Sequence, residues 1–72
     1  MAQLTHEQYD DLERAVRDGS RLAVWRRGTE YIVIPSRLRM LNGREAVEAI
    51  HPTTGESITI YLDDVDSIEL VR

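Results

Sequence analysis

The carboxylates of a short turn near the end of the chain are the first groups that could do chemistry. Asp63, Asp64 and Asp66 lie within four consecutive residues, and carboxylate oxygens at such a spacing could coordinate a divalent cation. A calcium loop also needs a glycine and inward-pointing backbone carbonyls, and this segment has no glycine. We therefore interpret the turn as a solvated acidic surface that contacts a protein partner, and we expect no metal.

The histidines and serines lack the neighbours that catalysis would need. His6 and His51 are far apart, neither has a second ligand at helical spacing, and the chain has no cysteine. None of the four serines lies in a nucleophile-elbow context, and no histidine is placed to activate one. A glycine-rich phosphate loop is also absent. The sequence therefore predicts a protein that is not an enzyme and uses no cofactor.

Arginines supply the alternative binding site. All nine basic Lys or Arg residues of the chain are arginines. Several of them are expected on strands or hairpin tips near aromatic side chains. Arginine beside aromatic rings on a small β fold suits phosphate contacts and base stacking, so the alternative partner is RNA or DNA. The residues of this site are Arg21, Arg26, Arg27, Arg37, Arg39, Arg44 and Trp25.

Charge changes sign twice along the chain. Residues 1–13 and 45–72 are acidic, residues 14–44 are basic, and the formal net charge is −4. Non-specific phosphate binders usually carry net positive charge, whereas opposed blocks of charge suit the orientation of a protein partner. The charge pattern therefore favours a protein partner over nucleic acid.

A helix is predicted over residues 5–18. Thr5 can cap its first turn, Gln8 completes a capping box, and Gly19 falls where a left-handed cap would end the helix. An apolar stripe at spacings of three and four residues must be buried on the rest of the fold. The stripe consists of Tyr9, Leu12, Ala15 and Val16.

Six short strands are predicted after the helix, in an antiparallel meander. Asn42-Gly43 predicts a type I′ hairpin that pairs Arg37 with Glu48, and Arg27-Gly28 predicts another turn. Pro35 cannot donate to a ladder, so it should mark a corner or an edge. The predicted strands span residues 21–26, 30–34, 37–41, 44–50, 57–62 and 68–71.

Both faces of the first strand pair are apolar. Alternation places Leu22 and Val24 on one face and Ala23 and Trp25 on the other. We expect one face to line a closed barrel and the helix to cover part of the other. The predicted fold is mainly β (α+β): an N-terminal helix followed by a five- to six-stranded antiparallel small barrel of the SH3 or Sm type.

Length and hydropathy predict one domain, residues 1–72. No apolar run reaches membrane-spanning length, and the first residues are charged where a signal peptide needs an apolar core. We therefore expect a soluble, cytoplasmic protein without a membrane partner.

The run of residues 31–70 resembles a WYL domain. This resemblance implies an Sm-type barrel and a bacterial transcriptional regulator that senses ligands or nucleic acid. The chain departs from the family where Glu45 and Ala46 replace the Trp-Tyr pair and where Asp64 replaces an arginine, so the basic ligand-reading positions are not carried over. The matching positions are Ala15, Pro35, Gly43, Ala49, Leu62, Asp63 and Val65.

A second resemblance is to the Rho-binding antiterminators, which are small acidic proteins with an N-terminal helix and a similar barrel. The segments 9–13 and 61–68 carry it. Three hypotheses follow: a regulatory module that binds a protein of the transcription machinery, a nucleic-acid-binding barrel, and a structural subunit of a homo-oligomer that pairs through a barrel edge.

Overall fold

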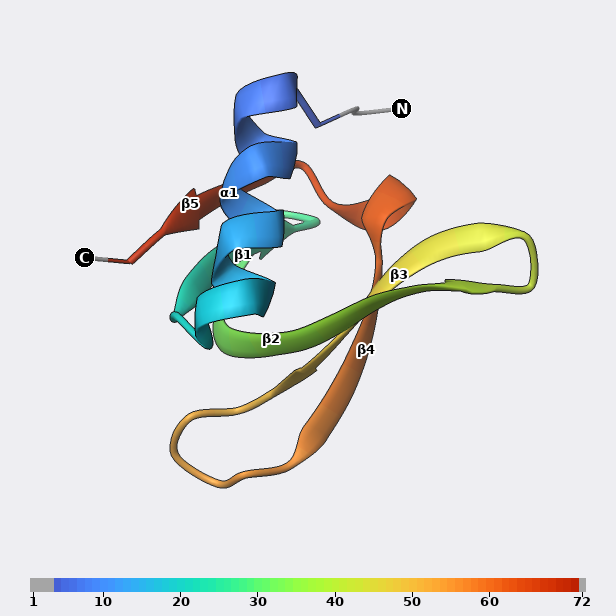
Figure 1. The fold of residues 1–72 in the computed structure, drawn as a ribbon. Helices are drawn as coiled ribbons and strands as arrows, with labels where there is room; N and C mark the ends of the chain where they lie inside the picture. Colours follow the sequence, from blue (N-terminus) through green and yellow to red (C-terminus); the bar gives the residue numbers. More distant parts are fainter. Residues whose placement is uncertain (1–3, 72) are drawn as a thin grey trace.

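The computed structural model describes residues 4–71, as one helix packed on five antiparallel strands (Figure 1). Helix α1 (His6–Asp18) begins with the predicted capping box: the Gln8 amide donates to Thr5 Oγ1 (3.1 Å) and the Thr5 amide donates to Gln8 Oε1 (2.9 Å). It ends at Gly19, whose φ of 68° gives the left-handed cap. These local signals were readable from the sequence alone.

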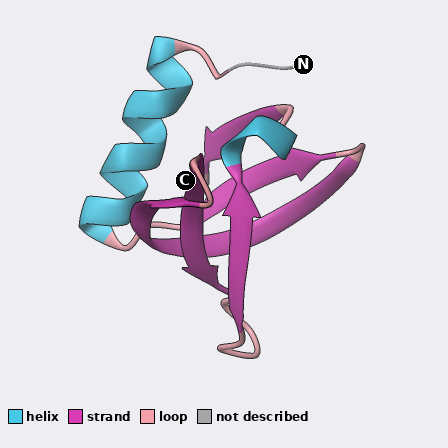
Figure 2. Cartoon of the chain, turned by 90° about the vertical axis from the view of Figure 1, so that its right-hand side faces the viewer, coloured by secondary structure: helices cyan, strands magenta, loops and turns pink. Residues whose placement is uncertain are grey.

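The strands form one sheet in the order β4-β3-β2-β1-β5, and every neighbouring pair is antiparallel. Between β4 and β5 a single 3-10 turn, η1 (Leu62–Asp64), redirects the chain so that β5 pairs with β1. The sheet is strongly curved and barrel-like, with β4 and β5 as its two edges (Figures 1 and 2). The strands are β1 (Leu22–Arg26), β2 (Thr29–Leu41), β3 (Arg44–Ile50), β4 (Ser57–Tyr61) and β5 (Ser67–Leu70).

The prediction of separate strands over residues 30–34 and 37–41 is wrong, because β2 runs unbroken through Pro35. The register against β3 shifts between Pro35 and Arg37, which leaves Ser36 as the extra residue of a bulge. Its hydroxyl donates to the Glu48 carbonyl at 2.9 Å. A bulge needs no ladder hydrogen bond from the proline nitrogen, so the strand bends at this point without ending.

Both predicted two-residue turns are present. Asn42 and Gly43 have φ values of 54° and 75°, as a type I′ turn requires, and the resulting register pairs Arg37 with Glu48 as predicted. Arg27 and Gly28 have φ values of 52° and 77° and close the β1–β2 hairpin in the same way.

The helix packs into the same core that the curved sheet lines. Leu12 and Ala15 are fully buried among the inward-facing side chains, and α1 lies against β2 and β5. The expected position of the helix, over the opposite face of the first hairpin, is therefore wrong. The stripe of the helix is buried instead on the side of the sheet that carries Leu22, Val24 and Val33, so helix and sheet share one core. The inward-facing strand residues of this core include Leu22, Val24, Val33, Val47, Ala49, Ile60 and Ile68.

Candidate interaction surfaces

An arginine at the start of β3 holds two of the three acidic residues of the turn. Arg44 donates to Asp63 twice, from Nη2 to Oδ1 at 2.5 Å and from Nε to Oδ2 at 3.0 Å, and its Nη2 lies 3.5 Å from Oδ2 of Asp64. Its guanidinium carbon lies 3.9 Å from the centre of the Tyr61 ring. These hydrogen bonds lower the pKa of Asp63 and raise the pKa of Arg44. Asp63 and Asp64 are thus engaged within the chain.

The third acidic residue of the turn supports the β1–β2 hairpin. The backbone amide of Arg27 donates to Oδ2 of Asp66 at 3.1 Å. The Asp66 amide in turn donates to the carbonyl of Trp25 at 2.8 Å. Asp66 therefore fastens this hairpin to the segment that enters β5. The acidic residues proposed from the sequence as one surface therefore make two separate sets of contacts within the chain: Asp63 and Asp64 with Arg44, and Asp66 with the β1–β2 hairpin.

The arginines of the alternative site lie in separate places. Arg37 and Arg39 converge on Glu48, with Arg39 Nη1 at 2.8 Å from Oε2 and Arg37 Nε at 3.7 Å from Oε1. At the other hairpin, the guanidinium carbon of Arg26 lies 5.0 Å from the ring centre of Tyr31. The structure therefore brings some of the arginines together, but it does so around carboxylates. The arginines that share the β2–β3 hairpin are Arg37, Arg39 and Arg44, and the carboxylates that pair with them are Glu48, Asp63 and Asp64.

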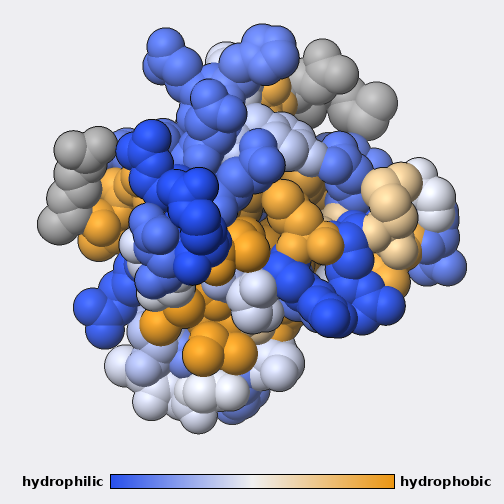
Figure 3. All heavy atoms as spheres, in the orientation of Figure 1, coloured by the Kyte–Doolittle hydropathy of each residue, from blue (hydrophilic) through white to orange (hydrophobic). Residues whose placement is uncertain are grey.

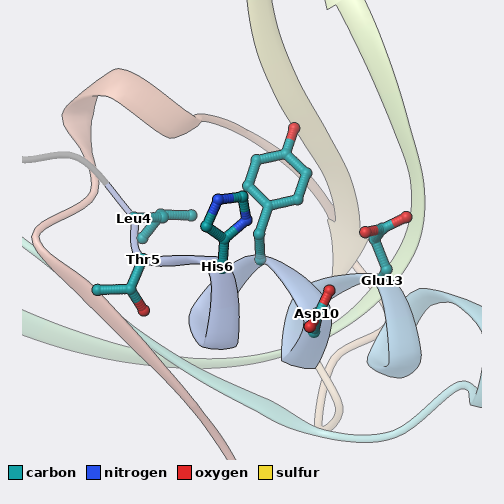
Figure 4. A pocket seen from close by; sticks show the side chains of 6 residues that line it. Leu4, Thr5, His6, Asp10 and Glu13 are labelled. Carbon is teal, nitrogen blue, oxygen red and sulfur yellow. The ribbon is translucent and has the colours of Figure 1, made fainter.

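A hollow of about 330 Å³ lies beside the first turns of α1, where His6, Asp10 and Glu13 project from successive turns (Figure 4). The Tyr9 hydroxyl at its wall donates to the carboxylate of Glu45. Burial, followed by this hydrogen bond and the nearby acidic charges, raises the pKa of Tyr9 to about 12. Within residues 4–71 no three His, Cys, Asp or Glu side chains are grouped so as to hold a metal ion.

The surface beside α1 is mixed in character. The helix presents mainly hydrophilic residues outward, and hydrophobic side chains reach the surface next to it (Figure 3). Over the part of the chain that the structure describes, no helix is both long enough and apolar enough to span a bilayer.

Several apolar side chains are exposed on the outward side of the sheet, around β1 and β2. Strand alternation turns the residues between the core residues outward, and α1 packs on the other side of the sheet, with the core. The exposed fractions of Ile32, Ile50 and Val71 are 36%, 38% and 43%. The sequence signal for this surface was the apolar character of both faces of the hairpin, which we had attributed to cover by the helix. We call this set the outer apolar face; it consists of Ala23, Trp25, Ile32, Ile34, Ile50 and Val71.

No protein-family model and no curated protein matches the chain. A solved structure does: proteasome accessory factor B/C (PafBC) of Arthrobacter aurescens aligns with a TM-score of 0.74 and 25% sequence identity. PafBC is a transcription regulator that contains WYL domains. This likeness supports a WYL-like relation. The alignment covers 97% of this chain and 12% of PafBC, so the likeness concerns one small module of a long protein.

The structure shows why a bulky aromatic side chain does not fit at one position where the chain departs from the WYL pattern. Ala46, where the resemblance places the second residue of the family's Trp-Tyr pair, is fully buried. It lies between Arg39 on β2 and Tyr61 on β4, so a bulky ring at this position would have to displace its neighbours. The resemblance to the Rho-binding antiterminators stays a prediction.

Proposed function

We propose that the chain is a non-enzymatic regulatory module that acts in transcription, in the cytoplasm, by binding a protein through the outer apolar face. The observation that carries this proposal is the exposure of neighbouring large apolar side chains on one face, Ile32 and Ile50 among them. Contiguous exposed apolar surface on a small protein is typical of protein contacts. The likeness to a transcription regulator supports the regulatory role.

The arrangement of the sheet supports an SH3- or Sm-type barrel as the scaffold. Its edge strands are β4 and β5, and a single 3-10 turn precedes the last strand. Small barrels of this kind host many unrelated functions, so the fold alone does not name the partner. The surface has to do so.

Charge pairing favours protein over nucleic acid as the partner. Arg37 and Arg39 share Glu48, and Arg44 is held by Asp63 and Asp64. A phosphate chain would have to compete with these carboxylates for every one of these arginines. An apolar protein surface would meet no such competition on the outer apolar face.

The test is a comparison of transcripts in the source organism. The genomic copy is deleted in one strain and carries Ile32→Glu in a second. In a third it carries Met40→Glu, a matched control because Met40 is 62% exposed and lies on the opposite face of the β2–β3 hairpin. We expect the deletion and Ile32→Glu to change the same transcripts and Met40→Glu to behave like the parent. Unchanged transcripts in the deletion strain would overturn the regulatory role. A folded Ile32→Glu protein that behaves like the parent would overturn the role of the face.

A further inference from the structure

We infer that the outer apolar face binds a second copy of this chain in a two-fold symmetric dimer. This inference rests on the proposed function, because it names the protein that the docking face receives. Three observations support it: the rows of apolar side chains, the charges beside these rows, and the area that a stable dimer must bury.

The pairing registers place the exposed apolar residues in adjacent rows across the sheet. Ile50 pairs with Ile34 across β3 and β2. On the other side of β2, the Val71 amide donates to the Arg21 carbonyl at 3.1 Å, which continues the β1–β5 ladder and brings Val71 into the same row. The next row holds Ile32 opposite Ala23. Ile32, Ile34 and Ile50 are therefore neighbours in space although they are scattered in the sequence, and Arg21 lies between Ile34 and Val71.

Both signs of charge lie on this same face. Arg21 continues the outward alternation at the start of β1 and falls in the Ile34 row. Glu69 is paired with Ala23 in the next row, and Glu30 with Trp25 in the row after that. All three charged side chains are exposed, and within residues 4–71 none has an opposite charge within 4.0 Å.

A second copy of the face complements these charges. In a two-fold symmetric contact, if one residue of the first copy meets a second residue of the other copy, the reverse contact is made as well. A face that carries both signs of charge can therefore pair the arginine of one copy with a glutamate of the other, twice. A partner of a single charge sign would satisfy one and repel the other. The face is therefore self-complementary in charge as well as apolar at its centre.

The area that a stable dimer must bury requires these charged residues to lie in the interface. A stable interface buries about 800 Å² per partner, about one-sixth of the 4817 Å² surface of this chain. Six residues of the outer apolar face, of which Ala23 is already 4% exposed, do not supply that area alone. The contact must extend to Arg21, Glu30 and Glu69.

The sheet edges are less suited to this contact. The edge strand β5 has four residues, and β4 has five. Short edge strands offer few unpaired backbone groups and are one way in which proteins avoid pairing through an edge. The convex face of β1 and β2 offers side-chain area that the edges lack.

The experiment is sedimentation equilibrium of the full chain over a range of concentrations. We expect the mass to rise from 8.3 kDa toward twice that value. Ile32→Glu should raise the dimer dissociation constant by about tenfold or more, and Met40→Glu should leave it unchanged. Arg21→Glu and Glu69→Arg should each weaken the dimer, and the double variant should dimerise better than either single variant.

A parent chain that stays monomeric at every concentration would overturn the dimer, as would a dimer that Ile32→Glu leaves intact. A double charge variant no better than the single variants would also overturn the two-fold contact. The two proposals fail separately. A monomeric parent whose Ile32→Glu variant still changes transcripts would show that the face docks another protein, and a dimer without any transcript effect would overturn only the regulatory role.

Discussion

Arg44 and Asp63 are joined by two hydrogen bonds, of 2.5 and 3.0 Å, that connect the start of β3 to the 3-10 turn η1. The two residues are 19 positions apart in the sequence. The contact holds the β2–β3 hairpin against the segment that carries the chain back toward β5. Since both side chains are substantially exposed, at 41% and 43%, salt should weaken the pair.

The first prediction concerns the acid side of the stability curve. The Arg44 hydrogen bonds hold the pKa of Asp63 below its ordinary value. A depressed pKa in the folded state stabilises the fold above the unfolded-state pKa, and this contribution is lost as the pH falls through the folded-state pKa. We expect the melting temperature of the parent to fall more steeply below about pH 4 than that of Asp63→Asn, measured by thermal melts from about pH 7 downward.

Glu56→Gln is the control for that experiment, because it removes an exposed carboxylate with no arginine within 4.0 Å among residues 4–71. Its melting curve should keep the acid slope of the parent. If Asp63→Asn and the parent lose stability in parallel, the pair contributes nothing in solution.

The second prediction concerns the packing of the helix. Leu12 is fully buried in the core shared by the helix and the sheet, so Leu12→Ala should reduce the free energy of unfolding by about 2–5 kcal/mol. Urea unfolding followed by circular dichroism measures this loss. The exposed residue Arg14 provides the control, and Arg14→Ala should stay within about 0.5 kcal/mol of the parent. A loss below about 0.5 kcal/mol in Leu12→Ala would mean that the helix is not anchored by its stripe.

What the sequence predicted well was local. The capping box of Thr5 and Gln8 and the turn at Asn42-Gly43 each depend on residues a few positions apart, and the turn in turn fixed the register of Arg37 with Glu48. The bulge at Ser36 was missed because an extra residue leaves the apolar alternation on either side intact.

What the sequence could not predict depends on the curvature of the sheet. Alternation shows that both faces of residues 21–34 are apolar, but it does not show which face becomes concave and receives α1. The exposure of Ile32 follows from that choice. The contact of Arg44 with Asp63 follows instead from the β3–β4 register, because Ala46 pairs with Tyr61 and η1 therefore begins opposite the start of β3.

The third prediction concerns the tip of the β2–β3 hairpin. Gly43 has a φ of 75°, and open space surrounds the position where a Cβ would lie, so any cost of a substitution comes from the backbone alone. Gly43→Val should reduce the free energy of unfolding by more than about 1 kcal/mol. Gly43→Asn, which tolerates positive φ, should lose less. Equal stability of Gly43→Val and the parent in urea would contradict the type I′ turn.

The last prediction concerns nucleic acid. Labelled single-stranded RNA and DNA of about 16 nucleotides should bind the parent only weakly at about 0.15 M salt, measured by fluorescence anisotropy. The reason is that Arg37 and Arg39 already share Glu48, and Arg44 is paired with Asp63 and Asp64. The double variant Arg37→Ala/Arg39→Ala should therefore bind no less than the parent.

Glu48→Gln supplies the matched control, because it keeps the shape of the side chain while releasing both arginines from their carboxylate. It should bind the same oligonucleotides more tightly than the parent if pairing is what suppresses phosphate contacts. Tight binding by the parent that weakens steeply with salt, and that the double variant abolishes, would instead make the arginine surface the functional one.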